Sequence, residues 1–164
     1  MQHTARQTIV TIINLLILLA LLVFVFGHSM QNQAESAQES LGVLAVLSHV
    51  MNTIVGHNNL TDHMVRKLAH FSEFAALGFF TIHLCRVRFD IGWHFVLHSL
   101  FFGLLCALTD ESIQIFNDRS AQVSDVWIDF AGVCCGILFF LLLHGIHRIW
   151  KKAPSEERTV SEAD

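Results

Sequence analysis

The sequence predicts an all-α, polytopic membrane protein with four transmembrane helices. Of its 164 residues, 53% are hydrophobic and only 15% are charged, an apolar share above that of ordinary soluble domains. Several apolar runs are long enough to cross a bilayer core of ~30 Å as a helix. These runs cover about residues 9–26, 68–85, 91–108 and 126–143.

The first and fourth runs give the clearest spans, whereas the second and third carry ionisable side chains. His70, Glu73 and His83 lie in the second run, and His94 and His98 lie in the third. Such side chains are costly against lipid, so neighbouring helices must shield them. This requirement favours a four-helix bundle.

The distribution of Lys and Arg predicts that both termini face the cytoplasm. One side of the bundle is flanked by Arg6, Arg86, Arg88, Arg148, Lys151 and Lys152, and the other by Arg66, Lys67 and Arg119. We assign residues 1–150 to one membrane domain. The polar residues 151–164 are predicted to form a disordered cytoplasmic tail.

An outer segment connects the first two spans. Leu41, Leu44, Leu47 and Met51 recur at helical spacing after Ser40, which is a suitable N-cap residue. This pattern predicts an amphipathic helix, which either lies on the outer membrane surface or acts as a lid over a site.

Other features limit the possible functions. The net charge is −4 and the cations are scattered, so the sequence predicts no nucleic-acid partner. The four cysteines lie in apolar runs without metal-ligand spacing and are interpreted as small buried hydrophobic residues. There is no phosphate-binding glycine loop, and we predict no cofactor.

The second span begins with ionisable residues on one helical stripe. Arg66, His70 and Glu73 are separated by four and then three residues. Glu73 is expected roughly 8 Å inside the outer membrane boundary, at ~1.5 Å per helical residue. A carboxylate at that depth needs a partner or must be neutral, and Lys67 and Arg119 are further candidate partners.

Two later segments are expected to reach the same outer end. In the connector 109–125, Gln114 is one turn from both Asp110 and Glu111, so a short helix there would direct all these side chains alike. At the start of the fourth span, an acidic stripe continues into small residues that permit close helix packing. This stripe consists of Asp125, which is alternatively only an N-cap, and of Asp129, Gly132 and Gly136.

These segments together resemble the VanZ-like family of bacterial membrane proteins. Lys67, His70, Phe71, Glu73 and Phe74 are similar to the family's Lys-x-x-His-Phe-x-Glu-aromatic helix start. A second block of the family is matched by Asp110, Glu111, Gln114, Phe116, Arg119, Asp125, Asp129, Gly132 and Gly136. The layout is similar over residues 9–147, although the family's usual Pro-Gly turn before the arginine is missing and Asp129 replaces the commoner Asn.

The resemblance implies a multi-pass protein of the bacterial cytoplasmic membrane with a role in the cell envelope. The family takes its name from an accessory protein in low-level resistance to teicoplanin, a glycopeptide. The resemblance does not supply a reaction, so it leaves open whether this chain is an enzyme.

Four hypotheses follow for the outer polar residues. In the first, they bind a membrane lipid or a lipid-linked, cell-wall or glycopeptide-type component without altering it, through Lys67, Gln114, Arg119, Asp125 and Asp129. In the second, the protein is an acid/base enzyme that acts on such a component through His70, Glu73, Asp110 and Glu111.

A metal-assisted version of the enzyme would use His70, Glu73, Asp125 and either Asp110 or Glu111. The sequence has no H-E-x-x-H or similar local spacing, so no metal site is predicted from it. In the fourth hypothesis, the same residues form a paired polar network that only fixes the register of the helices.

Overall fold

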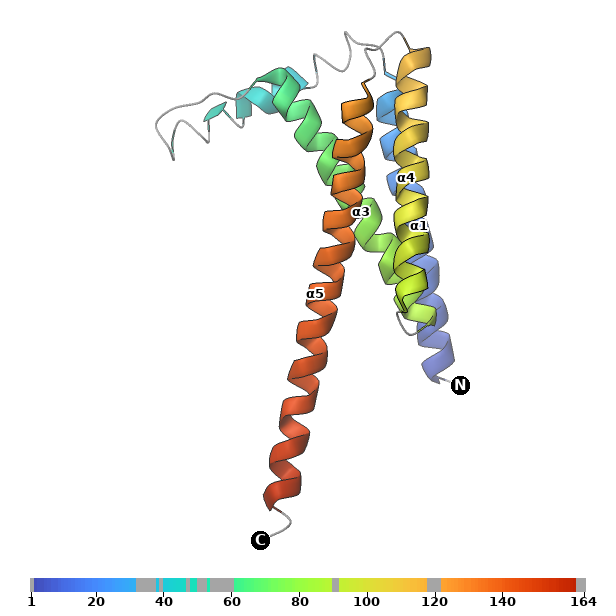
Figure 1. Cartoon of the computed structure of the whole chain (residues 1–164), viewed down its shortest axis with the longest axis vertical. Coiled ribbons are helices and arrows are strands. Elements are labelled where there is room, and N and C mark those ends of the chain that lie inside the picture. Colours follow the sequence, from blue (N-terminus) through green and yellow to red (C-terminus); the bar gives the residue numbers. More distant parts are fainter. Residues whose placement is uncertain are drawn as a thin grey trace.

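The structure is a computed structural model that describes residues 2–31, 38, 40–46, 48–49, 53, 61–89, 92–117 and 122–161. Helices are the only regular elements in these ranges, which confirms the predicted all-α class. The long helices, shown in Figure 1, are α1 (Gln2–Ser29), α3 (Asp62–Arg88), α4 (Trp93–Phe116) and α5 (Val123–Ser161).

Each long helix contains a segment that is long and apolar enough to cross a membrane. These segments are Ala5–Ser29, Asp62–Val87, Trp93–Phe116 and Val123–Lys151. Many large apolar side chains on them are exposed, among them Leu16, Leu19 and Val23 of α1 and Phe139 of α5. An exposed apolar surface of this extent suits lipid rather than water, so the protein is a multi-pass membrane protein, as predicted.

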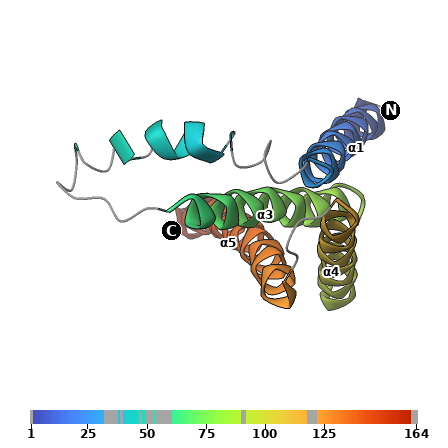
Figure 2. The same ribbon diagram turned by 90° about the horizontal axis from the view of Figure 1, so that it is seen from above.

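The helix α3 is the central element and packs against each of the other long helices. Figure 2 shows α1 on one side of α3, with α4 and α5 on the other. The apolar core between them includes Val25 of α1, Phe74 and Leu77 of α3, Ala107 of α4 and Val133 of α5.

The contact between α3 and α5 is close enough to require glycine. A Cβ atom on Gly132 would lie 2.4 Å from the carbonyl oxygen of Phe71, and one on Gly136 would lie 1.9 Å from that of Ala75. Gly78 of α3 makes the reciprocal approach, 2.4 Å from the carbonyl oxygen of Val133. The stripe of small residues therefore packs against the neighbouring backbone, as predicted.

Two predicted boundaries differ from the structure. The third span was predicted to end near residue 108, but α4 continues to Phe116 because its polar residues face the bundle interior. The tail was predicted to be disordered from residue 151, but α5 continues to Ser161. Lys, Ala and Glu, which recur in this tail, all favour helix.

The predicted outer helix is described only in part. Residues 40–46 are helical, whereas Leu47 and Met51 lie outside the described residues. Ser40 is itself helical and is therefore not an N-cap; its hydroxyl donates a hydrogen bond to Asp62 at the start of α3. The helix α3 has its own N-cap, Thr61, whose side chain accepts a hydrogen bond of 3.3 Å from the backbone N–H of Met64.

Candidate functional site

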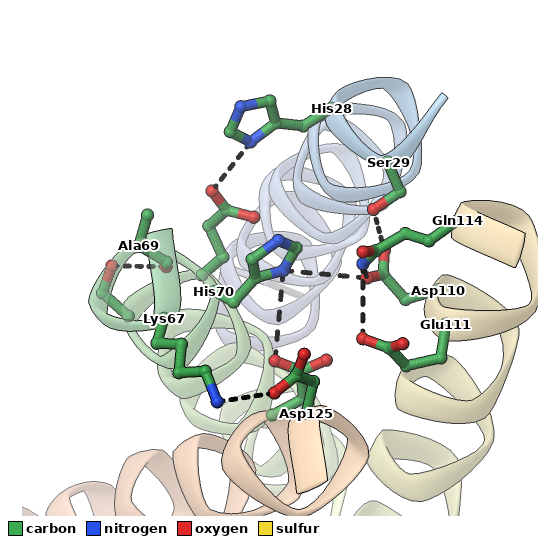
Figure 3. Close-up of polar contacts among 12 residues, drawn as sticks. His28, Ser29, Lys67, Ala69, His70, Asp110, Glu111, Gln114 and Asp125 are labelled. Atoms are coloured by element: carbon green, nitrogen blue, oxygen red, sulfur yellow. Dashed lines mark hydrogen bonds and ion pairs between the residues drawn. The ribbon is translucent and has the colours of Figure 1, made fainter. Parts of the chain in front are cut away.

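The end of the bundle opposite the two termini brings together side chains from every long helix (Figures 1 and 3). The helices α1 and α4 end there, and α3 and α5 begin there. We call this region the outer end, following the predicted orientation. The residues drawn together there include Ser29, His70, Asp110, Glu111, Gln114 and Asp125.

Asp110 is the most deeply buried acid of the outer end, with no exposed surface. Its Oδ1 accepts a hydrogen bond of 2.5 Å from the Ser29 hydroxyl, and its Oδ2 accepts one of 2.8 Å from Gln114 Nε2. Gln114 Nε2 also donates to Glu111 Oε1 at 3.4 Å. The side chains of Asp110, Glu111 and Gln114 thus converge as predicted, but from α4 itself rather than from a connector.

His70 of α3 faces acids on two other helices. Its Nδ1 lies 3.7 Å from Asp110 Oδ2 and 4.0 Å from Asp129 Oδ1. The Asp129 side chain is only 2% exposed. The fold thus unites an imidazole with buried carboxylates from α4 and α5.

Glu73 contacts a histidine that sequence reasoning missed. Its Oε1 lies 3.4 Å from Nδ1 of His28, near the end of α1, and its Oε2 is buried without a hydrogen-bond partner among the described residues. The His28 ring also stacks on His70, with the ring centroids 6.2 Å apart. The structure therefore adds the imidazole of His28 to the predicted surroundings of Glu73.

The Lys and Arg side chains described at this end pair with less buried acids. Lys67 Nζ lies 2.9 Å from Asp125 Oδ1, which joins the start of α3 to the first turn of α5. Arg66 pairs at 3.2 Å with Asp62, one helical turn before it. Arg119, predicted as a ligand-binding residue, lies outside the described residues.

A small polar cavity opens among these residues. It has a volume of about 100 Å³ and lies between α3, α4 and α5. Its walls combine cations, acids and amides, and include Lys67, His70, Glu111, Gln114, Asp125 and Asp129.

A second, mostly apolar cavity adjoins the first along α3. It has a volume of about 420 Å³ and lies between α1, α3 and the helical residues 40–46. Phe24, Val43, Val65 and Leu68 are among its lining residues, and His28 and Glu73 also reach it. Arg66 and His70 line both cavities, so the two spaces share a wall.

The family model for VanZ/LLP1 matches residues 13–144. This range includes the residues of α3, α4 and α5 that line the polar cavity and those of α1 and α3 that line the apolar cavity. No curated protein and no solved structure matches the chain. The match extends over more than half of the chain and includes the second and third membrane-crossing segments and most of the first and fourth. The chain therefore belongs to the VanZ/LLP1 family, as the VanZ-like motifs indicated.

Proposed function

We propose that this VanZ-like membrane protein binds an amphipathic component of the cell envelope, of the lipid-linked precursor type. The polar group of the ligand occupies the polar cavity, and its hydrocarbon chain lies in the apolar cavity. The observation that carries this proposal is the wall shared by the two cavities, formed by Arg66 and His70. A molecule with adjacent polar and apolar parts suits this arrangement.

The chemistry of the polar cavity supports a head group with both donors and acceptors. Lys67 and Gln114 offer N–H donors, and Asp125 and Glu111 offer carboxylate oxygens. Phosphate-sugar and peptide groups present both kinds of partner. Lys67 is already paired with Asp125 at the rim, so an anionic group on the ligand would exchange with that carboxylate.

The apolar cavity supports the position of the hydrocarbon chain. Val43 and Leu68 are exposed at its edge, whereas Val65 is buried in its wall. Apolar surface that is open beside a membrane-crossing helix suits an acyl or prenyl chain entering from the bilayer. We propose that the cavities lie on the extracytoplasmic side of the bacterial cytoplasmic membrane. We also propose that the protein has an accessory role in glycopeptide resistance.

Filling the apolar cavity tests the proposal. Val43→Trp places a large ring in the cavity, while Val46→Trp changes a more exposed residue on the same helical stretch that does not line it. We expect Val43→Trp to weaken binding of a fluorescent lipid-linked cell-wall precursor at least about tenfold in nanodiscs, and Val46→Trp to leave it unchanged. Equal binding by the two variants would contradict the proposed chain position.

The same assay distinguishes binding from catalysis. After incubation with wild-type protein, the recovered precursor is expected to be chemically unchanged by mass spectrometry. A product that depends on the protein would replace the binding function with the acid/base enzyme. No retention of the precursor by the wild-type protein would reject both.

A further inference from the structure

We propose that His70, Asp110 and Asp129 form a binding site for a divalent metal ion that accepts mixed imidazole and carboxylate ligands, of the Mn²⁺ or Zn²⁺ type. One potential ligand atom from each residue lies within 4.8 Å of the others. This is the sole group of its kind found among the described residues. This metal site is separate from the proposed lipid binding, and its test uses no lipid ligand.

The distances fit an ion after a small adjustment of side chains. An ion with ligand distances of ~2.1 Å holds neighbouring ligand atoms roughly 3.0 to 3.4 Å apart, depending on its geometry. His70 Nδ1 is 3.7 Å from Asp110 Oδ2 and 4.0 Å from Asp129 Oδ1. Binding of the ion therefore requires side-chain rotations that bring these atoms together from separations of at most 4.8 Å.

Asp129 provides an independent indication that this group binds a cation. Its side chain is 2% exposed, and its Oδ2 is buried with no hydrogen-bond partner in the part of the chain that the structure describes. Carboxylates in such surroundings are normally paired or coordinate a metal. In those same ranges, no Lys or Arg forms an ion pair with Asp110 or Asp129. The basic side chain that lies within ion-pair distance of both acids is His70.

The surroundings of Asp110 resemble the outer shell of a metal site. The hydroxyl of Ser29 and the amide of Gln114 each hold one of its carboxylate oxygens, which fixes the orientation of the group. Asp110 Oδ2 retains a lone pair for the ion after accepting from Gln114. His70 and Asp129 also line the polar cavity, where water or another oxygen ligand completes the coordination.

The residue types select the class of ion. Imidazole suits transition metals and zinc, whereas carboxylates also suit Mn²⁺ and Mg²⁺. One histidine with two aspartates therefore favours an ion that accepts both. Two aspartates and a neutral histidine balance the charge of a divalent ion.

Mn²⁺ is the first probe, because its paramagnetism reports on its ligands. Purified full-length protein is stripped with EDTA, loaded with Mn²⁺ and desalted, and we expect one equivalent of Mn²⁺ per chain by mass spectrometry. Electron spin-echo measurements are expected to detect one histidine nitrogen. Zn²⁺ is expected to displace the bound Mn²⁺.

Variants identify the site. Asp129→Asn keeps the shape of the side chain and is expected to weaken Mn²⁺ binding at least about 100-fold. His70→Gln is expected to abolish the nitrogen signal. Asp62→Asn is the matched control, because Asp62 is an acid of α3 that pairs with Arg66 and Ser40 outside the group.

Several outcomes would overturn the metal site. They are a wild-type protein without stoichiometric Mn²⁺ or Zn²⁺, unchanged affinity in Asp129→Asn, or a nitrogen signal that persists in His70→Gln. If Asp129→Asn fails to insert, the stoichiometry and the His70→Gln spectrum still decide. Metal binding and precursor binding are measured separately, so a negative result for one does not decide the other.

Discussion

The two ends of the bundle both carry histidines, but they differ in charge and burial. At the outer end, His28 and His70 lie against Glu73, Asp110 and Asp129, which come from α3, α4 and α5. At the end with the termini, His83, His144 and His147 line a cavity of about 520 Å³ together with Arg86, Arg148 and Lys151.

The packing of the helices explains this difference. Figure 1 shows α5 diverging from α1 and α4 toward the C-terminus, whereas at the outer end His70 joins α3 to Asp110 of α4 and Asp129 of α5. Arg148 and Lys151 are accordingly exposed, while Asp110 and Asp129 are buried. Imidazoles among accessible cations suit a membrane surface, and imidazoles enclosed with acids make a candidate site. Charge and enclosure, rather than the histidines themselves, distinguish the two ends.

The largest expected effect concerns the sides of the membrane that the two ends face. In a background without native cysteines, His63→Cys probes the outer end and Trp150→Cys the opposite one; both positions are exposed. We expect a membrane-impermeant maleimide to label position 63 in intact cells and position 150 only after permeabilisation. Labelling of both from the same side would contradict the predicted orientation.

An added methyl group on α5 should lower the stability of the protein only where the backbones of α3 and α5 are in close contact. Gly136→Ala places a methyl group against the Ala75 carbonyl and is expected to destabilise the protein by about 2–3 kcal/mol. Gly145→Ala is the matched control, since a Cβ there meets nothing within 4 Å and Ala favours helix. Thermal unfolding in detergent measures both, and equal melting temperatures would contradict the packing.

A smaller contrast is expected between a buried and a half-exposed acid of the outer end. Asp110→Ala leaves Ser29 and Gln114 without their acceptor and is expected to cost about 1–3 kcal/mol of stability in metal-free protein. Asp125→Ala removes only the partly exposed contacts of this carboxylate with Lys67 and the Ser124 hydroxyl, and is expected to cost about 0–1 kcal/mol. Chemical unfolding of EDTA-treated protein compares them, and a larger loss for Asp125→Ala would reverse the ranking.

Much of the fold and of the outer cluster could be predicted from the sequence. Hydropathy located the spans, and helical spacing placed His70 and Glu73 on α3 and Asp125 and Asp129 on α5. The chain reverses direction after each span, so the ends of α1 and α4 and the starts of α3 and α5 lie on the same side of the membrane. The polar end of α4 was predicted as a connector, because hydropathy alone cannot distinguish a buried polar face from a loop.

His28 and Ser29 could not be recognised in the same way. They follow a long apolar run and have no periodic polar neighbours, so their sequence context resembles an ordinary helix end. Their role depends on tertiary contacts with Glu73 and Asp110, which lie far away in the chain. The residues Gly27, His28 and Ser29 at the end of the first apolar run gave the available signal, a change from apolar to polar residues.

The glycine contacts also set a limit on how the outer end can change. Phe71 and Ala75 of α3 already meet Gly132 and Gly136 within about two turns of His70 and Asp129, with no side chain between the backbones. The two helices therefore cannot move closer, and moving them apart would open the core beneath. Related chains that recognise larger or smaller groups would have to vary side-chain length above these glycines while keeping the helix spacing constant.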